Sequence, residues 1–340
     1  MPEARRTTLY DVARRSGVSY QTVSRVINRH PSVSDETRER VQRAIIELDY
    51  RPNRAAQSLA GTKSRTLAMV TYGLNNYGPA QMVINIEQAC REAGYDLIFT
   101  NVADHHLTTL KGSIEYIRRW DMDGLLLITP VEGLSYDDLA AMFGNIPVAL
   151  IGTRMGSSAP SIVVDQMAGT RQITEHLIGL GHTHISEISG PSQWFDAQER
   201  HESWLETLQS HGLTPGASIE GDWSAKSGYA ATRTLLTSGE RFTALVVAND
   251  QMAMGAIHAL REHGLRVPQD ISVAGFDDIP EAAYFGPPLT TIRQDFAKLG
   301  RQGVEHLIQR INNPGHHSKQ DVIAPQLIMR ESTALPRLRE

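Results

Sequence analysis

Four side chains near the start of the chain have the chemistry and the spacing to read the edges of DNA bases. Between residues 19 and 28 the apolar residues recur at helical spacing, so one face of the expected helix is buried. An arginine can donate two hydrogen bonds to guanine and a glutamine can pair with adenine, and each such pair contributes roughly 1–3 kcal/mol of discrimination. The opposite face, which we expect to read bases, carries Tyr20, Gln21, Ser24 and Arg25. Ordinary solvated surface residues are the alternative interpretation.

A second group of polar side chains follows apolar segments in the second half of the chain. Asn249 and Asp250 follow the segment 245–248, and Asp277 and Asp278 come directly after 273–276. If these segments are parallel strands, their carboxyl ends meet at one edge of a sheet, where α/β proteins bind ligands. Amides and carboxylates there suit the hydroxyls of a sugar, although capping of the strand ends would also explain them.

Two further features could carry chemistry, and each has a plainer interpretation. Histidines cluster at 105–106, 182–184 and 316–317 without Cys, Asp or Glu partners at ligand spacing, which favours solvated loops over a metal site. The single cysteine, Cys90, lies in a predicted helix and is expected to be a buried thiol that suits a reducing cytoplasm. The sequence contains no P-loop or nucleophile-elbow motif. We therefore predict no metal, no cofactor and no enzymatic activity.

Three short helices in the first fifty residues would position the base-reading face. Thr8 is expected to begin the first helix, with Asp11 placed to complete a capping box. Gly17 ends that helix and Ser19 begins the second, so the two meet in the tight turn of a helix-turn-helix. Ser34 is expected to cap a third, supporting helix.

Charge divides the 340 residues into two parts. Residues 1–63 contain 12 Lys and Arg against 7 Asp and Glu, whereas 64–340 contain 21 against 31, which gives −5 overall. A basic segment joined to an acidic one is typical of a nucleic-acid-binding module attached to another domain. No apolar run approaches the roughly 20 residues that span a bilayer, and no secretory signal is recognised. We expect a cytoplasmic protein without membrane contact.

From residue 65 onward, apolar segments of strand length alternate with longer amphipathic segments. This alternation indicates parallel sheets covered by helices on both faces. There are enough segments for two sheets of about five or six strands each. The apolar segments are 67–70, 97–99, 125–128, 148–151, 185–188, 245–247 and 271–273.

The first sixty residues resemble the LacI family of transcription regulators, and the resemblance extends over nearly the whole chain. It rests on the runs 8–13, 17–26 and 50–61, the last of which matches the family's hinge helix. The resemblance implies an α/β fold with a three-helix helix-turn-helix head, a hinge helix, and two Rossmann-like lobes of the periplasmic-binding-protein type. The implied divisions are a head (1–51), a hinge and linker (52–64), and an effector-binding and dimerisation domain (65–335), with lobe one at 65–164 and 294–323 and lobe two at 165–293 and 324–335.

For the head, the resemblance implies contacts with both the bases and the backbone of DNA. Because Tyr20, Gln21 and Arg25 match the family motif, we expect a twofold-repeated half-site similar to GTGAGC. The hinge would insert Leu59 into the central base step from the minor groove. Phosphate and hinge contacts are implied for Thr8, Ser19, Thr22, Asn28, Ser34, Thr37, Tyr50, Asn53, Gln57, Leu59 and Ala60.

For the lobes, the resemblance implies a ligand in the cleft between them. The implied lining residues are Pro79, Met82, Asp196, Arg200, Trp223, Asn249, Asp277, Gln294 and Phe296. The chain also departs from a sugar-binding family member: Ile128 replaces an asparagine, Gly152 an aspartate, and Trp194 and Asp196 two serines. We therefore expect a sugar-like ligand that differs from that of the relative.

Together these features predict a repressor that binds a palindromic operator as a homodimer and is released by a small sugar-like effector. A corepressor-dependent regulator of the same family is the first alternative. A sugar-processing enzyme on a similar fold is the second, and a transport binding protein, which the basic head opposes, is the third. No leucine heptads follow the last predicted strand, so we expect a dimer and no tetramer.

Overall fold

The computed structural model describes residues 7–27, 30–50, 64–102, 104, 106–128, 136–157, 159–313 and 319–337. The chain divides into two compact units, Met1–Ser64 and Arg65–Glu340, which we call the head and the body. No helix in the described part of the chain is long and apolar enough to cross a membrane. Five residues of the predicted DNA contacts lie outside the described residues: Asn28, Asn53, Gln57, Leu59 and Ala60.

The head consists of three helices, α1 (Leu9–Ser16), α2 (Tyr20–Ile27) and α3 (Asp35–Glu47). Thr8 and Asp11 form the expected capping box, because each side chain accepts a hydrogen bond from the backbone N–H of the other. Gly17 then ends α1 in the left-handed conformation, with φ at +66°. Ser19 caps α2 by accepting a hydrogen bond from the backbone of Thr22 at 3.1 Å. These local signals fix the helix-turn-helix geometry predicted from the sequence.

One detail of the third helix differs from the prediction. Ser34 occupies the N-cap position of α3, but its side chain makes no capping bond to the backbone. Instead its hydroxyl donates to the hydroxyl of Thr37 at 3.0 Å. The helix begins there because Asp35 and Glu36 place two carboxylates in its first turn, where they interact favourably with the helix dipole.

A small core joins the three helices of the head. Its buried members come from all three helices and include Val12, Val23, Val26 and Val41. Tyr50, predicted as a DNA contact, belongs to the same core and is only 8% exposed. The core leaves one face of α2 outside, and that face carries the residues predicted to read bases.

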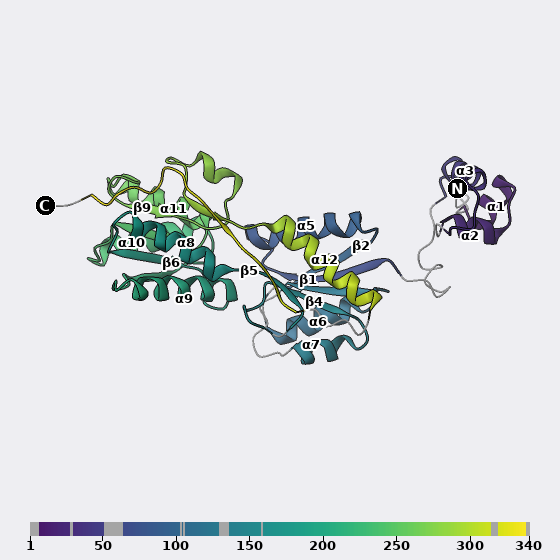
Figure 1. The fold of residues 1–340 in the computed structure, drawn as a ribbon, viewed down its shortest axis with the longest axis horizontal. Coiled ribbons are helices and arrows are strands. Elements are labelled where there is room, and N and C mark those ends of the chain that lie inside the picture. Colours follow the sequence, from purple (N-terminus) through teal and green to yellow (C-terminus); the bar gives the residue numbers. More distant parts are fainter. Residues whose placement is uncertain are drawn as a thin grey trace, which may run out of the picture. The chain divides into compact units, whose positions relative to one another are not determined.

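Lobe one of the body is built on a six-stranded parallel sheet in the order β11-β5-β4-β3-β1-β2 (Figure 1). Apolar side chains alternate between its two faces, so Leu67 and Met69 pack under α5 and α12, whereas Ala68 and Val70 pack under α6 and α7. The elements are β1 (Thr66–Tyr72), α5 (Tyr77–Glu92), β2 (Asp96–Val102), α6 (Leu107–Ile117), β3 (Gly124–Ile128), α7 (Tyr136–Phe143), β4 (Val148–Ile151), β5 (Ser161–Val164), α12 (Phe296–Asn312) and β11 (Asp321–Ile323).

Lobe two is built on a four-stranded parallel sheet in the order β7-β6-β8-β9. Helices α10 and α11 cover one face of this sheet, and α8 and α9 cover the other. The elements are α8 (Gln166–Gly179), β6 (Ile185–Ser189), α9 (Phe195–Ser210), β7 (Ser218–Glu220), α10 (Ala225–Thr237), β8 (Ala244–Val247), α11 (Asp250–Glu262), β9 (Ser272–Ala274), the 3-10 helix η1 (Pro280–Tyr284), β10 (Thr291–Arg293) and β12 (Gln326–Ile328).

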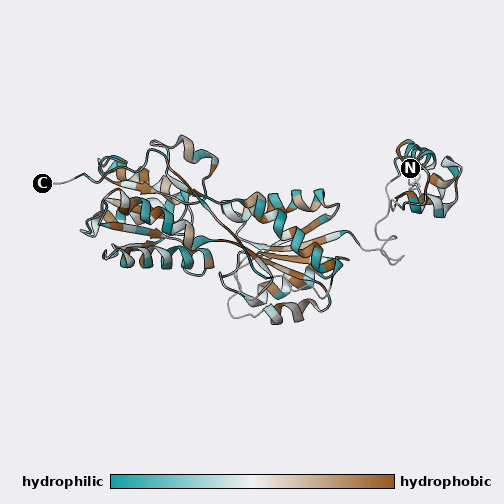
Figure 2. Ribbon diagram, viewed as in Figure 1, coloured by the Kyte–Doolittle hydropathy of each residue, from teal (hydrophilic) through white to brown (hydrophobic). Residues whose placement is uncertain are grey.

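The expectation of five or six strands in each sheet is therefore wrong for lobe two. Strand β10 pairs antiparallel with β12 and touches the sheet only through two isolated bridges, from Thr290 to Ala274 and from Arg293 to Asp277. These two short strands lie in connections between the lobes, and the yellow C-terminal segment that contains β12 can be followed from one lobe to the other in Figure 1. The strands themselves are strongly apolar, whereas the helices that cover them carry hydrophilic residues on their outer surfaces (Figure 2).

Three chain crossings connect the two sheets. Strand β5 lies in the lobe-one sheet and leads into α8 of lobe two, β10 returns to α12, and β11 leads to β12. The chain passes from one lobe to the other at these points, and the carboxyl ends of strands from both sheets meet at this junction. This junction is where the polar strand-end residues come together.

Candidate functional site

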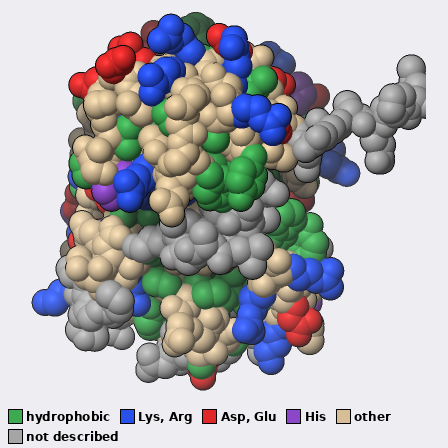
Figure 3. Space-filling model, turned by 90° about the vertical axis from the view of Figure 1, so that its right-hand side faces the viewer, with side chains coloured by type: hydrophobic (Ala, Val, Ile, Leu, Met, Phe, Trp, Pro, Cys, Tyr) green, Lys and Arg blue, Asp and Glu red, His purple; other side chains and the backbone are tan. Residues whose placement is uncertain are grey.

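The exposed face of α2 carries the residues predicted to read bases. Tyr20, Gln21 and Arg25 are exposed, and Ser24 is partly buried. The ring of Tyr20 packs on that of Tyr10 from α1, with centroids 4.9 Å apart, which fixes its orientation. On the face of the molecule drawn in Figure 3, Lys and Arg side chains lie among Asp and Glu, hydrophobic side chains and other polar or backbone atoms. The hydroxyl, amide and guanidinium groups exposed on α2 can contact a phosphate backbone as well as base edges.

Several of the predicted phosphate contacts lie at the starts of the head helices. Three of them are exposed and directly precede a helix: Thr8, Ser19 and Ser34. The other two, Thr22 and Thr37, lie three residues after Ser19 and Ser34. Backbone N–H groups at helix N-termini point outward and attract anions. The arrangement therefore offers hydroxyl and amide donors to a phosphate.

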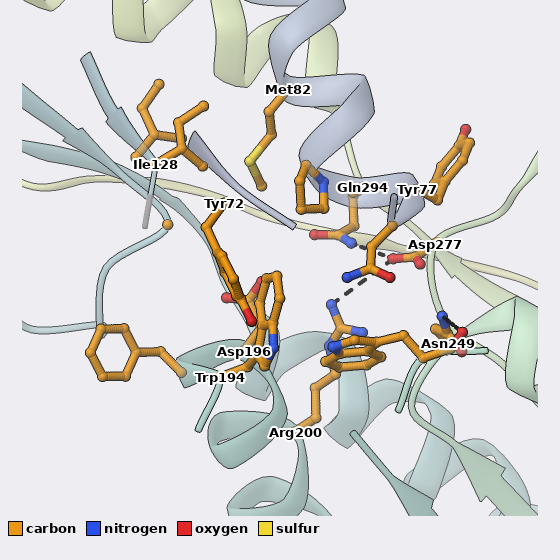
Figure 4. A pocket seen from close by; sticks show the side chains of 17 residues that line it. Tyr72, Tyr77, Met82, Ile128, Trp194, Asp196, Arg200, Asn249, Asp277 and Gln294 are labelled. Atoms are coloured by element: carbon orange, nitrogen blue, oxygen red, sulfur yellow. Dashed lines mark hydrogen bonds and ion pairs between the residues drawn. The ribbon is translucent and has the colours of Figure 1, made fainter. Parts of the chain in front are cut away.

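A cleft lies between the two lobes of the body and is partly open to solvent. Figure 4 shows Met82 and Ile128 at one end of this cleft, with Arg200 and Asn249 at the other. Of the nine residues predicted to line it, eight do so: Pro79, Met82, Asp196, Arg200, Trp223, Asn249, Asp277 and Gln294.

Phe296 is the ninth, and it does not line the cleft. Its ring packs against Tyr77 at a centroid distance of 6.0 Å and belongs to the lobe-one core. It contributes instead to a neighbouring groove at the lobe junction. The bulky side chain at the start of α12 is needed to fill the space under α5, so its role here is packing.

A chain of hydrogen bonds joins four buried polar side chains beside the cleft, at the junction of the two lobes. The Arg200 Nε donates to Gln166 Oε1 at 2.9 Å, and Gln166 Nε2 donates to Gln294 Oε1 at 3.2 Å. Gln294 Nε2 in turn donates to Asp277 Oδ1 at 2.6 Å. The guanidinium also donates to the backbone carbonyl of Ala248 and lies over the ring of Phe276, 3.7 Å from its centroid. Each of these polar side chains therefore has a hydrogen-bond partner within the protein.

Asp277 is the central anion of this network. The Arg200 Nη2 lies 4.0 Å from its carboxylate, and the aspartate is 8% exposed. Burial raises the pKa of Asp277 to about 6, although Arg200 and Gln294 oppose the shift. Burial also raises the pKa of Asp196, against the influence of Arg200. Hydroxyl groups of a ligand could donate hydrogen bonds to both carboxyls.

Asn249 and Trp223 form the end of the cleft beside β8. Asn249 caps α11 by accepting from the Met252 backbone at 2.9 Å, and its amide donates to the Trp223 carbonyl at 3.0 Å. Asn249 therefore has the capping role that was the plainer interpretation of this residue, and it also lines the cleft. Trp223 adopts a left-handed backbone, with φ at +74°, and its buried indole N–H has no partner within the described structure. That N–H is a donor that a ligand can satisfy.

Aromatic residues at the lobe boundary were missed in the sequence. Tyr72 ends β1, and its ring lies 5.0 Å from that of Trp194, centroid to centroid. Asn76, Tyr77 and Phe195 also line the cleft. The replacement of a serine by Trp194 was visible, but no local pattern indicates that this side chain reaches the opposite lobe.

A second contact between the lobes lies beside the cleft, where the loop after β4 meets α9. The backbone N–H of Met155 donates to Glu199 Oε1 at 2.8 Å, and Arg154 hydrogen-bonds Gln198. Arg154 Nη1 also lies 3.9 Å from Glu202 Oε1. Burial raises the pKa of Glu199 to about 7, the Met155 N–H opposes the shift, and the neighbouring charge of Asp196 adds to it.

The raised pKa of Glu199 predicts that the body becomes more stable as the pH falls. The folded state binds this proton more tightly than the unfolded chain, whose ordinary value is 4.5, so the free energy of unfolding rises from about pH 7 down to 4.5. The slope from one such group reaches about 1.4 kcal/mol per pH unit at most. Denaturant titrations across this range should show a shallower pH dependence for Glu199→Gln, and identical slopes would contradict the assignment.

Comparisons with known proteins agree with this architecture. Residues 8–53 match the model of bacterial regulatory proteins of the lacI family, and residues 174–333 match that of a periplasmic binding protein-like domain. The lactose operon repressor of Escherichia coli K12 is 38% identical over 97% of this chain and 91% of its own length. The PurR transcriptional repressor of Haemophilus influenzae PittEE is 36% identical over 96% of this chain and 98% of its own.

A solved structure of a relative also matches nearly the whole chain. The crystal structure of the lac repressor dimer bound to operator and the anti-inducer ONPF superposes with a TM-score of 0.89. The two chains are 38% identical, and the match covers 97% of this chain and 100% of the lac repressor chain. The similarity therefore includes the head and both lobes.

Proposed function

This chain belongs to the LacI family of bacterial regulatory proteins, and from that premise we propose that it is a sequence-specific transcriptional repressor. It binds a palindromic operator as a homodimer, and a small sugar-like effector in the interlobe cleft releases it. The observation that carries the proposal is the exposed face of α2, where Gln21 and Arg25 project outward while Val23 and Val26 are buried. That arrangement supports reading of the major groove.

The cleft supports the effector half of the proposal. Carboxylates, an amide and a guanidinium from the ends of lobe-two strands and helices converge on it, and Trp223 supplies an aromatic surface. The described residues include no group of three His, Cys, Asp or Glu side chains able to hold a metal ion. The convergence of these hydrogen-bonding groups beside an aromatic surface favours binding of a hydroxylated ligand, which would change the angle between the lobes and thereby the position of the heads. Corepression by the same cleft is the second candidate, since a ligand can favour either lobe angle.

The DNA-binding proposal can be tested without assuming a target sequence. The intact protein would be used to select duplexes from a random library over several rounds at fixed salt. We expect enrichment of an inverted repeat with half-sites similar to GTGAGC, because a twofold dimer presents two copies of α2. Recovery of duplexes without a shared motif would contradict sequence-specific binding.

We also propose that the protein is a dimer in solution. The operator-bound relative is described as a dimer, and a palindromic operator requires twofold symmetry of its reader. Sedimentation velocity at micromolar concentration should give a single species of twice the 37.6 kDa chain mass. A tetramer or a monomer at that concentration would contradict this arrangement.

A further inference from the structure

The interlobe contact beside the cleft is firmly anchored on its lobe-one side. One side chain, Gln320, directly precedes β11 of the lobe-one sheet and bonds the loop 153–157 at several points. Its Oε1 accepts from the backbone N–H of Gly156 at 2.7 Å, and its Nε2 donates to the Arg154 carbonyl at 2.9 Å. The loop is therefore part of lobe one, although it reaches across to lobe two.

The lobe-two side of the contact is the first half of α9. Gln198, Glu199 and Glu202 face the loop from this helix. Ser203, one turn after Glu199 on the same face, donates to a backbone carbonyl of α8 at 2.7 Å. This face of α9 is thus covered by α8 along one part and, at Glu199, by the lobe-one loop. Neither Glu199 nor Met155 lines the cleft, so the contact lies outside the expected effector pocket.

The surroundings of Glu199 oppose its ionisation while the loop covers it. The residue is only 6% exposed, and burial is the largest influence on its pKa. Asp196 in the first turn of α9 and Asp165 before α8 add negative charge, which also raises the pKa. Arg154 and the backbone N–H of the loop act in the opposite sense, but the guanidinium is shared with Glu202, 3.9 Å away. An ionised carboxylate is therefore accommodated better when the lobes separate and water reaches it.

We propose that Glu199 and the loop 153–157 form a proton-sensitive latch, which joins the lobes when the carboxyl is protonated and weakens when it ionises. Separation of the lobes uncovers the side chain and returns its pKa from about 7 toward the ordinary 4.5. The joined arrangement then binds the proton more tightly, so its extra stability is complete below pH 4.5 and is lost as the pH rises to about 7. The Met155 N–H prefers an ionised acceptor, but burial has the larger effect.

Amide hydrogen exchange in the intact protein, followed by mass spectrometry, measures opening of the latch. After correction for intrinsic exchange rates, protection of the loop 153–157 should be roughly tenfold greater at pH 6 than at pH 8, the change that proton linkage gives for a pKa of about 7. Amides of the buried strands β3 and β6 are the internal reference, since they exchange when a lobe unfolds. A loop that exchanges as slowly as these strands does not open in the folded protein, and that result would overturn the proposal.

Two carboxamide variants of α9 separate protonation from packing. Glu199→Gln keeps an oxygen that accepts from Met155 and cannot ionise, so the loop should keep its pH 6 protection at pH 8. A variant that merely disturbed packing would lose protection instead. Glu202→Gln removes a half-exposed carboxylate beside the same arginine and should retain the tenfold difference. A tenfold difference that persists in Glu199→Gln, or low protection of that variant at both pH values, would refute the latch.

The link from the latch to DNA binding rests on the proposed function. If the lobe angle positions the heads, the operator affinity should change between pH 6 and pH 8 by different factors in the unaltered protein and in Glu199→Gln. Effects of pH on the DNA contacts are common to both proteins and cancel. Fluorescence anisotropy with a duplex carrying an inverted GTGAGC repeat would measure the two factors. Equal factors would refute the link while the exchange result stands, whereas no operator binding at either pH would refute the proposed function.

Discussion

Replacing Arg25 by alanine should lower affinity for the operator by roughly tenfold to hundredfold per half-site and relax discrimination at one guanine. Arg25 is exposed on α2, where its guanidinium can donate two hydrogen bonds to a base edge, whereas Val23 and Val26 on the other face hold the helix on the head core. Fluorescence anisotropy with operator duplexes altered at single positions would measure both effects. The relaxed position identifies the base that Arg25 reads.

A matched control distinguishes base reading from a general loss of positive charge. Arg14 is also exposed in the head but lies on α1. Arg14→Ala should leave the ratio of affinities for operator and scrambled duplexes unchanged, even if a lost phosphate contact weakens both. If Arg25→Ala likewise weakens both duplexes in equal proportion, then Arg25 contacts only the backbone and the half-site assignment is wrong.

Asp277→Asn should raise the effector concentration needed for release by more than tenfold while operator binding persists. The carboxylate is the central anion of the cleft, held by Gln294 at 2.6 Å with Arg200 nearby. Hydrogen bonds from sugar hydroxyls to a charged group contribute about 1.5–3 kcal/mol each, so losing the charge should weaken effector binding by more than tenfold. The measurement is the concentration of a releasing sugar needed to displace the protein from a labelled operator.

The same variant should be more stable than the unaltered protein near pH 8. Since burial raises the pKa of Asp277 from 3.8 to about 6, ionisation at high pH costs the folded state on the order of 2–3 kcal/mol, and this cost disappears as the pH falls from about 6 to 3.8. The substituted amide carries no charge at any pH, so the gain should vanish at low pH. Denaturant titrations at pH 8 and pH 4.5 would measure the difference.

Asp278 provides the matched control for this substitution. It is the next residue in the chain, but its carboxylate pairs with Arg293 and Arg330, each at 2.6 Å, and does not line the cleft. Asp278→Asn should therefore lower stability and leave release by the effector intact. Loss of release in Asp278→Asn with retention in Asp277→Asn would contradict the assignment of the cleft.

Local signals were sufficient to predict the head. The capping box of Thr8 and Asp11, the left-handed Gly17 and the cap at Ser19 each act within four residues, so the three helices follow from short-range interactions. The exposed face of α2 then follows from the spacing of its valines. The side-chain cap expected from Ser34 did not form, because its hydroxyl bonds to Thr37 instead.

The body could be predicted less completely because its site is made by distant segments. The alternation of strands and helices indicates parallel sheets, but the three chain crossings came only from the family resemblance. β10 is three residues long and pairs with β12 across the lobe junction, a partner that no local pattern specifies. For the same reason Trp194 was noted only as a substitution, since its contact with Tyr72 depends on how the two lobes meet.

Glu199 and Phe296 illustrate the limits of sequence patterns in opposite ways. Glu199 is followed by polar residues in an amphipathic helix, where a carboxylate is ordinarily solvated, yet here the loop after β4 covers it. Phe296 occupies a position that matches the family's ligand contacts, but its ring fills the core between α12 and α5. In both cases the packing of a second element decides the role of the side chain.

The most direct test of the account is a titration of the intact protein onto two duplexes at fixed salt. One carries an inverted GTGAGC repeat with a central CG step, and the other carries the same bases scrambled. Fixed salt matters because phosphate contacts make both affinities strongly salt-dependent. We expect at least about hundredfold tighter binding to the repeat, a threshold that lies below the usual ratio of specific to non-specific affinity of roughly 10³–10⁷. Equal, weak binding to both duplexes, with and without added sugars, would contradict sequence-specific recognition of the operator.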